Sequence, residues 1–163
     1  MKIYWLFFLI LIAFTSRGQE PGAKLYNPSS NATTEISDAV RRAKASQKHV
    51  LIQAGGNWCK WCIEFNRFSK SDKQIDSILN ADYIIYHLNY SPENKNASVF
   101  AKYGYPQRFG FPVFLVLDEN GNRIHTQNSS YLEQGRSYNK EKVIQFLELW
   151  NKKAIDPLAY KNF

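Results

Sequence analysis

The sequence has few residues that bind metals or form disulfides. Cys59 and Cys62 are its only cysteines, whereas an exported protein stapled by disulfides usually has several widely spaced ones. A structural zinc site needs four ligands. His49, His87 and His125 are far apart and show no paired spacing. We therefore expect neither a disulfide scaffold nor a metal site.

Long runs of one residue type are also missing. The 163-residue chain carries 21 Lys and Arg against 14 Asp and Glu, but no basic run exceeds two residues. A nucleic-acid groove would need clustered basic residues with interleaved aromatics, so we expect no nucleic-acid partner. No apolar run reaches the roughly 20 residues that a membrane-spanning helix requires. The length suits one domain, and there are no internal repeats.

The longest apolar run, residues 3–14, lies at the N-terminus. It follows Lys2 and precedes the polar stretch "TSRGQ". This order is typical of a secretory signal peptide. We expect residues 1–18 to be that signal peptide and residues 19–33, rich in Pro, Ser and Asn, to form a flexible segment. The protein is predicted to be exported, and thus periplasmic or secreted, where disulfides persist.

Apolar periodicity predicts alternating helices and strands after residue 33. Thr34 is the expected N-cap of the first helix. Helices are expected at residues 35–48, 57–71, 98–103 and 139–154, with 72–80 either a further helix or a continuation after a kink. Strands are expected at 49–55, at 82–90 and on both sides of the turn at Asn120-Gly121. This order predicts an α/β fold in which a central mixed β-sheet is flanked by helices on both faces.

The cysteine pair could be a staple, a metal clamp or a redox reagent. A loop this small constrains the unfolded chain poorly, and further metal ligands are missing. The predicted strand ends near Gly55 and the helix begins near Cys59, so that thiol lies where free N–H groups favour a thiolate. Lys60 adds positive charge. Cys62 lies one turn deeper, which suits a thiol that resolves a mixed disulfide.

This arrangement resembles the thioredoxin family. The resemblance covers residues 34–153 and rests on a strand, a W-C-x-x-C motif opening a helix, and "GFPVFLVLDENGN"; the predicted domain is 34–163. More narrowly, "WCKWC" is similar to small exported thioredoxin-like proteins. The resemblance implies a thiol–disulfide oxidoreductase that exchanges disulfides with protein substrates. Its redox-active disulfide takes the place of a cofactor, and a membrane or soluble partner resets it.

The resemblance also implies a substrate groove. Pro112 matches a cis proline that lies against the cysteine pair, and the backbone of Phe111 would bind an extended substrate. From the residues alone, Pro112 equally fits the first position of a strand. Trp58 matches the tryptophan beside the site. Trp61 either packs on the helix surface or contacts unfolded substrates. The long loop at residues 90–110 is either a specificity element or a tolerated insertion.

Two departures from the family bear on the mechanism. Lys60 and Trp61 replace the Gly-Pro of thioredoxins, a dipeptide that influences redox poise. Gln53 replaces a buried aspartate, and an amide cannot accept the proton of Cys62. Water or another group must then take it. An alternative function is a binding module or holdase with a non-cycling disulfide, which Gln53 favours slightly. A peroxide-reducing enzyme fits less well, and the direction of electron flow stays open.

Overall fold

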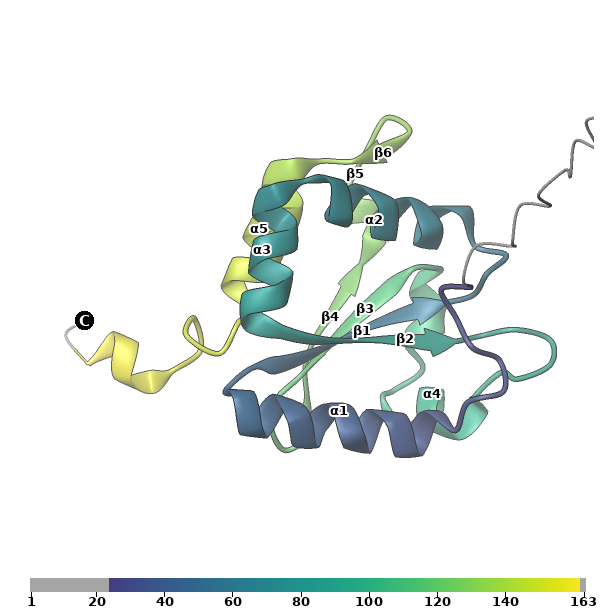
Figure 1. Ribbon diagram of the computed structural model, residues 1–163, viewed down its shortest axis with the longest axis horizontal. Helices are drawn as coiled ribbons and strands as arrows, with labels where there is room; N and C mark the ends of the chain where they lie inside the picture. Colours follow the sequence, from purple (N-terminus) through teal and green to yellow (C-terminus); the bar gives the residue numbers. More distant parts are fainter. Residues whose placement is uncertain (1–23, 162–163) are drawn as a thin grey trace, which may run out of the picture.

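A four-stranded sheet forms the centre of the computed structural model, which describes residues 24–161 (Figure 1). Its strands are β1 (His49–Gly55), β2 (Tyr83–Asn89), β3 (Val113–Leu117) and β4 (Arg123–Asn128). The order across the sheet is β2-β1-β3-β4. β2 runs parallel to β1, whereas β3 is antiparallel to both β1 and β4. The sheet is therefore mixed, as predicted.

Helices cover both faces of this sheet, which confirms the predicted fold class. They are α1 (Ala32–Ser46), α2 (Lys60–Ser71), α3 (Lys73–Asp82), α4 (Ala97–Lys102) and α5 (Lys140–Leu149). α1 and α4 pack on one face, and α2, α3 and α5 pack on the other (Figure 1). Short 3₁₀ turns lie at Pro106–Phe109, Ser129–Tyr131 and Pro157–Tyr160.

The central strand β1 divides its side chains between the two faces. Every one of its residues is buried. Because successive side chains of a strand point to opposite faces, Val50 and Ile52 join the cluster under α1, and Leu51 joins the cluster under α2, α3 and α5. Gln53, two residues after Leu51, points to the same face of the sheet as Leu51. The strand thus directs a polar side chain toward the start of α2.

The first helix begins earlier than predicted. Asn31, not Thr34, is its N-cap, and the Asn31 side chain accepts a hydrogen bond from the backbone N–H of Thr34 at 3.2 Å. Residues 24–33, which we expected to belong to a flexible segment, contain the first residues of α1 and the fully buried Tyr26. The expected signal peptide, residues 1–18, lies outside the described residues.

The hairpin between β3 and β4 follows the prediction, but its turn is built differently. Among the residues of this turn, 118–122, only Gly121 has a positive φ, of 81°. The Asp118 carboxylate accepts hydrogen bonds from the backbone N–H groups of Asn120 and Asn122, at 2.9 and 2.8 Å. This side chain closes the turn in place of a second left-handed residue.

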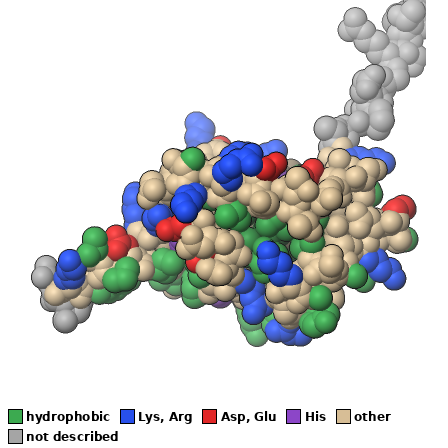
Figure 2. All heavy atoms as spheres, turned by 90° about the horizontal axis from the view of Figure 1, so that it is seen from below, with side chains coloured by type: hydrophobic (Ala, Val, Ile, Leu, Met, Phe, Trp, Pro, Cys, Tyr) green, Lys and Arg blue, Asp and Glu red, His purple; other side chains and the backbone are tan. Residues whose placement is uncertain are grey.

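The surface offers no single basic groove on the face seen from below, where Lys and Arg side chains occupy several separate places (Figure 2). Within residues 24–161, none of the helices combines the length and the apolar character needed to cross a bilayer. The last turn, Pro157–Tyr160, extends away from the sheet (Figure 1).

Candidate redox site around the Cys59–Cys62 disulfide

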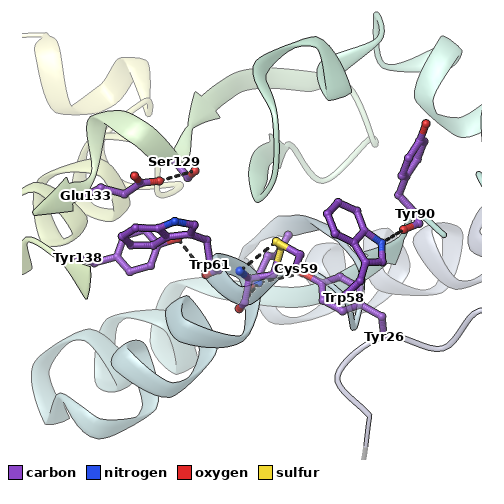
Figure 3. The surroundings of a disulfide bond; sticks show 10 residues. Tyr26, Trp58, Cys59, Trp61, Tyr90, Ser129, Glu133 and Tyr138 are labelled. Atoms are coloured by element: carbon purple, nitrogen blue, oxygen red, sulfur yellow. Dashed lines mark hydrogen bonds between the residues drawn. A yellow bond between two sulfur atoms is a disulfide. The ribbon is translucent and has the colours of Figure 1, made fainter. Parts of the chain in front are cut away.

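Cys59 and Cys62 form a disulfide at the start of α2 (Figure 3). The S–S distance is 2.03 Å and the Cα–Cα distance is 5.2 Å. Cys59 is the N-cap of the helix, and its sulfur accepts a hydrogen bond from the backbone N–H of Cys62 at 3.1 Å. Cys59 is 4% exposed and Cys62 is fully buried. Cys59 is therefore slightly the more exposed residue of the pair.

The electrostatic surroundings of Cys59 favour a negative charge. The N–H groups of the first turn of a helix have no partners within the helix and carry its positive dipole end. The first turn of α2 contains no acidic residue, whereas those of α1, α3 and α5 each contain one. Lys60 follows directly and is exposed. A thiolate on Cys59 would be stabilised here relative to an ordinary thiol.

Behind the disulfide lies a buried polar pair. Gln53, 2% exposed, uses its Nε2 to donate to the carbonyl of Cys62 and to the hydroxyl of Tyr26, both at 2.9 Å. Burial raises the pKa of Tyr26 well above its usual value, despite the hydrogen bond from Gln53. Tyr26 therefore stays protonated at neutral pH. The position where thioredoxins carry an acid holds an amide bonded to a phenol.

The backbone of Tyr26 is fixed to the loop that leads into the motif. Its N–H donates to Asn57 Oδ1 at 3.1 Å, and Asn57 Nδ2 donates back to its carbonyl at 2.8 Å. Sequence reasoning missed Tyr26, because the Pro-, Ser- and Asn-rich composition around it indicates a flexible segment. No local signal predicts that this tyrosine packs against a cysteine pair more than 30 positions later.

An exposed aromatic surface also lies beside the disulfide. Trp58 is 55% exposed, and its Nε1 donates to the carbonyl of Tyr90 at 2.7 Å. Its ring meets Phe111 edge to face, with centroids 5.6 Å apart. The Phe111–Pro112 bond is cis, as the resemblance implied, and Phe111 packs against the buried cluster of Tyr26, Cys59 and Cys62. A hollow of about 360 Å³ lies here, lined by Trp58, Tyr90, Ser91, Pro92 and Lys95.

Trp61 lies on the other side of the motif from Trp58 and is partly buried (Figure 3). Its ring meets Tyr138 edge to face at 5.4 Å, and its carbonyl accepts a hydrogen bond from the Tyr138 hydroxyl at 3.0 Å. Tyr138 belongs to a small hairpin of β5 (Glu133–Gln134) and β6 (Ser137–Tyr138), which the sequence did not predict. This hairpin supports the start of α2.

The three histidines do not converge. His49 bonds to the carbonyl of Trp150 at 2.9 Å, and His125 stacks on the Trp150 ring at 4.0 Å. His87 meets the Tyr26 ring edge to face at 5.6 Å. Among residues 24–161, no group of three or more His, Cys, Asp or Glu residues could hold a metal ion. These side chains belong to the packing of the domain.

A mixed sheet between helices, with a disulfide opening α2 beside a cis proline, defines a thioredoxin-like protein. The model of a family described as thioredoxin-like matches residues 31–119, more than half of the chain. The chain belongs to this family.

Similar proteins carry the name of a thiol–disulfide exchanger. The thiol:disulfide interchange protein DsbD of Salmonella typhi is 27% identical over 109 residues, covering 67% of this chain and 18% of that protein. DsbD of Colwellia psychrerythraea is 23% identical over 143 residues, covering 78% of this chain and 23% of that protein. The chain thus spans less than a quarter of the length of these relatives.

Two solved structures share the fold. The disulphide isomerase of Xylella fastidiosa Temecula1 aligns with a TM-score of 0.66 and 20% identity, covering 76% of this chain and 94% of that one. The oxidised C-terminal domain of DsbD from Neisseria meningitidis aligns with a TM-score of 0.53 and 16% identity, covering 75% and 97%.

Proposed function

We propose that this protein is an exported thiol–disulfide oxidoreductase that acts on protein substrates. Cys59 is the nucleophile and Cys62 is the resolving thiol. The observation that carries the proposal is the position of the Cys59 sulfur as the cap of α2, where it accepts a backbone hydrogen bond. That position stabilises the thiolate that disulfide exchange requires. The names of the DsbD relatives support the same chemistry.

The reaction needs only sulfur atoms and protons. In the reducing direction, the Cys59 thiolate attacks a substrate disulfide, forming a mixed disulfide and releasing one substrate thiolate. The Cys62 thiolate then attacks the Cys59 sulfur, so the Cys59–Cys62 bond forms and the second substrate sulfur leaves. The substrate gains two electrons and the pair loses two. Disulfide formation is the reverse, and a membrane or soluble partner resets the pair.

The exposed aromatic surface is proposed to receive the substrate. Trp58 presents an apolar face that is held in place by its bond to the carbonyl of Tyr90. The backbone of Phe111, next to Pro112, would pair with an extended segment of substrate, as a strand adds to a sheet. Lys60 modulates Cys59 through its adjacent positive charge, and Gln53 modulates Cys62 through the hydrogen bond to its carbonyl. Export is proposed from the apolar run at residues 3–14.

Exchange with a disulfide-bonded protein such as insulin tests the assignment of the two cysteines. Cys59→Ser is expected to abolish exchange, because the attacking sulfur is lost. Cys62→Ser is expected to accumulate a mixed disulfide between Cys59 and the substrate, visible as an added mass on the intact protein. Wild-type exchange rates in Cys59→Ser would contradict the proposal.

The reduction potential separates the remaining alternatives. The pair can be equilibrated with glutathione or dithiothreitol and its free thiols counted by alkylation and mass. A potential near roughly −270 mV would resemble thioredoxin and indicate a reductant, and one near roughly −120 mV would indicate an oxidant. A pair that showed no reversible titration would replace the oxidoreductase with the binding module or holdase.

A further inference from the structure

We propose that Tyr26 stabilises the resolving thiolate: its hydroxyl donates a hydrogen bond to the Cys62 sulfur when the disulfide opens. This inference rests on the proposed exchange reaction. Gln53 cannot accept the proton of Cys62, and the inference names Tyr26 as the group that stabilises the Cys62 thiolate instead. It gives a role to a segment that precedes the domain predicted from the sequence.

The Tyr26 hydroxyl and the Cys62 sulfur both pack against Gly55. They come this close because Gly55 has no side chain. A Cβ placed on Gly55 would lie 2.4 Å from the Cys62 sulfur and 2.9 Å from the Tyr26 hydroxyl oxygen. Both Tyr26 and Cys62 are fully shielded from solvent. The hydroxyl and the sulfur are therefore neighbours in a water-poor environment, where a hydrogen bond to a charged sulfur is strong.

The direction of the Gln53 hydrogen bonds leaves the Tyr26 proton available. The carbonyl of Cys62 can only accept, so the Gln53 atom that bonds to it at 2.9 Å must be the amide NH₂ group. The same NH₂ group lies 2.9 Å from the Tyr26 oxygen and donates to it. Within residues 24–161 the Tyr26 hydroxyl donates no hydrogen bond of its own. A Cys62 thiolate would supply the missing acceptor.

Tyr26 acts here as a donor and not as a base. Its raised pKa keeps the phenol protonated over the range in which thiols titrate. A thiol buried in apolar surroundings ordinarily resists ionisation, and a hydrogen-bond donor to the thiolate offsets that resistance. The proton of Cys62 itself leaves to solvent while the mixed disulfide is open to it. Tyr26 loses no proton in the resolving step.

The other titratable groups around Tyr26 do not ionise in this range. His87 from β2 packs on the Tyr26 ring, and burial, followed by the charge of Lys70 on α2, lowers its pKa to about 4. Tyr138 from β6 has its pKa raised, by burial first and then by Glu133, Tyr26 and Glu64. Both are neutral at the pH at which a cysteine ordinarily titrates, about 8.5.

The test compares the titration of Cys62 in the reduced wild-type protein and in Tyr26→Phe. The variant removes one oxygen and keeps the ring. The ¹³C shift of the labelled Cys62 Cβ, followed against pH, reports its pKa. A hydrogen bond to a charged group has a strength that corresponds to about one to two pKa units, so the Cys62 pKa is expected to rise by that amount. The resolving step at neutral pH is expected to slow about tenfold or more, with the titration of Cys59 unchanged.

Tyr83→Phe is the matched control. Tyr83 is a buried tyrosine whose hydroxyl bonds to the carbonyl of Leu147 on the other side of the domain, so its loss should leave Cys62 unmoved.

An unchanged Cys62 titration in folded Tyr26→Phe would overturn the role of Tyr26, and so would an equal shift in Tyr26→Phe and in the Tyr83→Phe control. This measurement needs no substrate. Failure of the wild-type protein to exchange disulfides with insulin would instead contradict the proposed function and leave the titration result standing on its own.

Discussion

At the scale of single residues, the side chains around the disulfide differ in exposure and polarity. Trp58 and Phe111 form an aromatic surface in which Trp58 is exposed, while Gln53 and Tyr26 form a buried polar pair. The sequence could predict Gln53 at the position of the family's acid, because its distance from Cys59 is fixed along the chain. It could not predict Tyr26, because that contact joins segments whose pairing depends on the whole fold.

Trp58 should affect large substrates more than small ones. Because it is half-exposed, Trp58→Ala should change the free energy of unfolding little. Exchange with insulin is expected to fall severalfold, whereas exchange with a small disulfide such as oxidised glutathione should stay near the wild-type rate. Leu149→Ala, which removes a similarly exposed apolar side chain at the end of α5, is the control. An equal loss with both substrates would mean that Trp58 shapes the cysteines and not the substrate surface.

His87 should make the fold sensitive to mild acid. Burial lowers its pKa from the ordinary 6.5 to about 4, so the unfolded chain takes up a proton first as the pH falls. The free energy of unfolding is therefore unaffected by His87 above about pH 6.5, and it decreases as the pH falls from there toward about 4. By linkage this decrease is up to about 3 kcal/mol.

Urea unfolding at several pH values measures this loss. In His87→Gln, the decrease in the free energy of unfolding between about pH 6.5 and 4 should be much smaller. Part of the decrease should remain, because burial also lowers the pKa of His125. Asp72→Asn is the control. The pKa of Asp72 is lowered by its hydrogen bond to Lys140 from an ordinary 3.8, so its contribution is lost only at lower pH. The same pH profile in His87→Gln as in the wild type would contradict this account.

At the scale of elements, periodicity and turn residues predicted the four strands of the central sheet and most helices. β1 was predicted with its bounds, because its buried apolar run ends at glycines. The β5–β6 hairpin was missed, because two-residue strands leave no periodic pattern and depend on contacts with α2. The start of α1 was misplaced because Asn31 and Thr34 are both good N-caps, and composition alone does not choose between them.

The N-cap of α1 provides a test at this scale. Asn31→Ala removes the side-chain acceptor for the Thr34 N–H and should lower the free energy of unfolding by about 1 kcal/mol. Thr34→Ala keeps that hydrogen bond, since only the backbone of Thr34 takes part, and should change stability by a few tenths of a kcal/mol. Chemical unfolding of both variants measures the difference. A larger loss for Thr34→Ala would restore the cap predicted from the sequence.

At the scale of the whole molecule, two hydrophobic layers hold the sheet between its helices, and the disulfide adds little to them. Closing a loop this short contributes about 2 kcal/mol in the chain-entropy model. The reduced protein should therefore stay folded, with a free energy of unfolding lower by no more than about that amount. Urea unfolding followed by circular dichroism, with and without dithiothreitol, measures this. An unfolded reduced protein would identify the disulfide as a structural staple.

The clamp between Asn57 and the backbone of Tyr26 has a practical consequence. The family match begins at residue 31, so a shortened protein cut to those bounds would retain both cysteines yet lose the tyrosine behind them. Such a truncated domain would uncover the buried Cys62, and we expect small thiols such as glutathione to reach it directly. In the proposed exchange reaction, residues 24–30 would therefore shield the resolving cysteine from thiols that have not first reacted with Cys59.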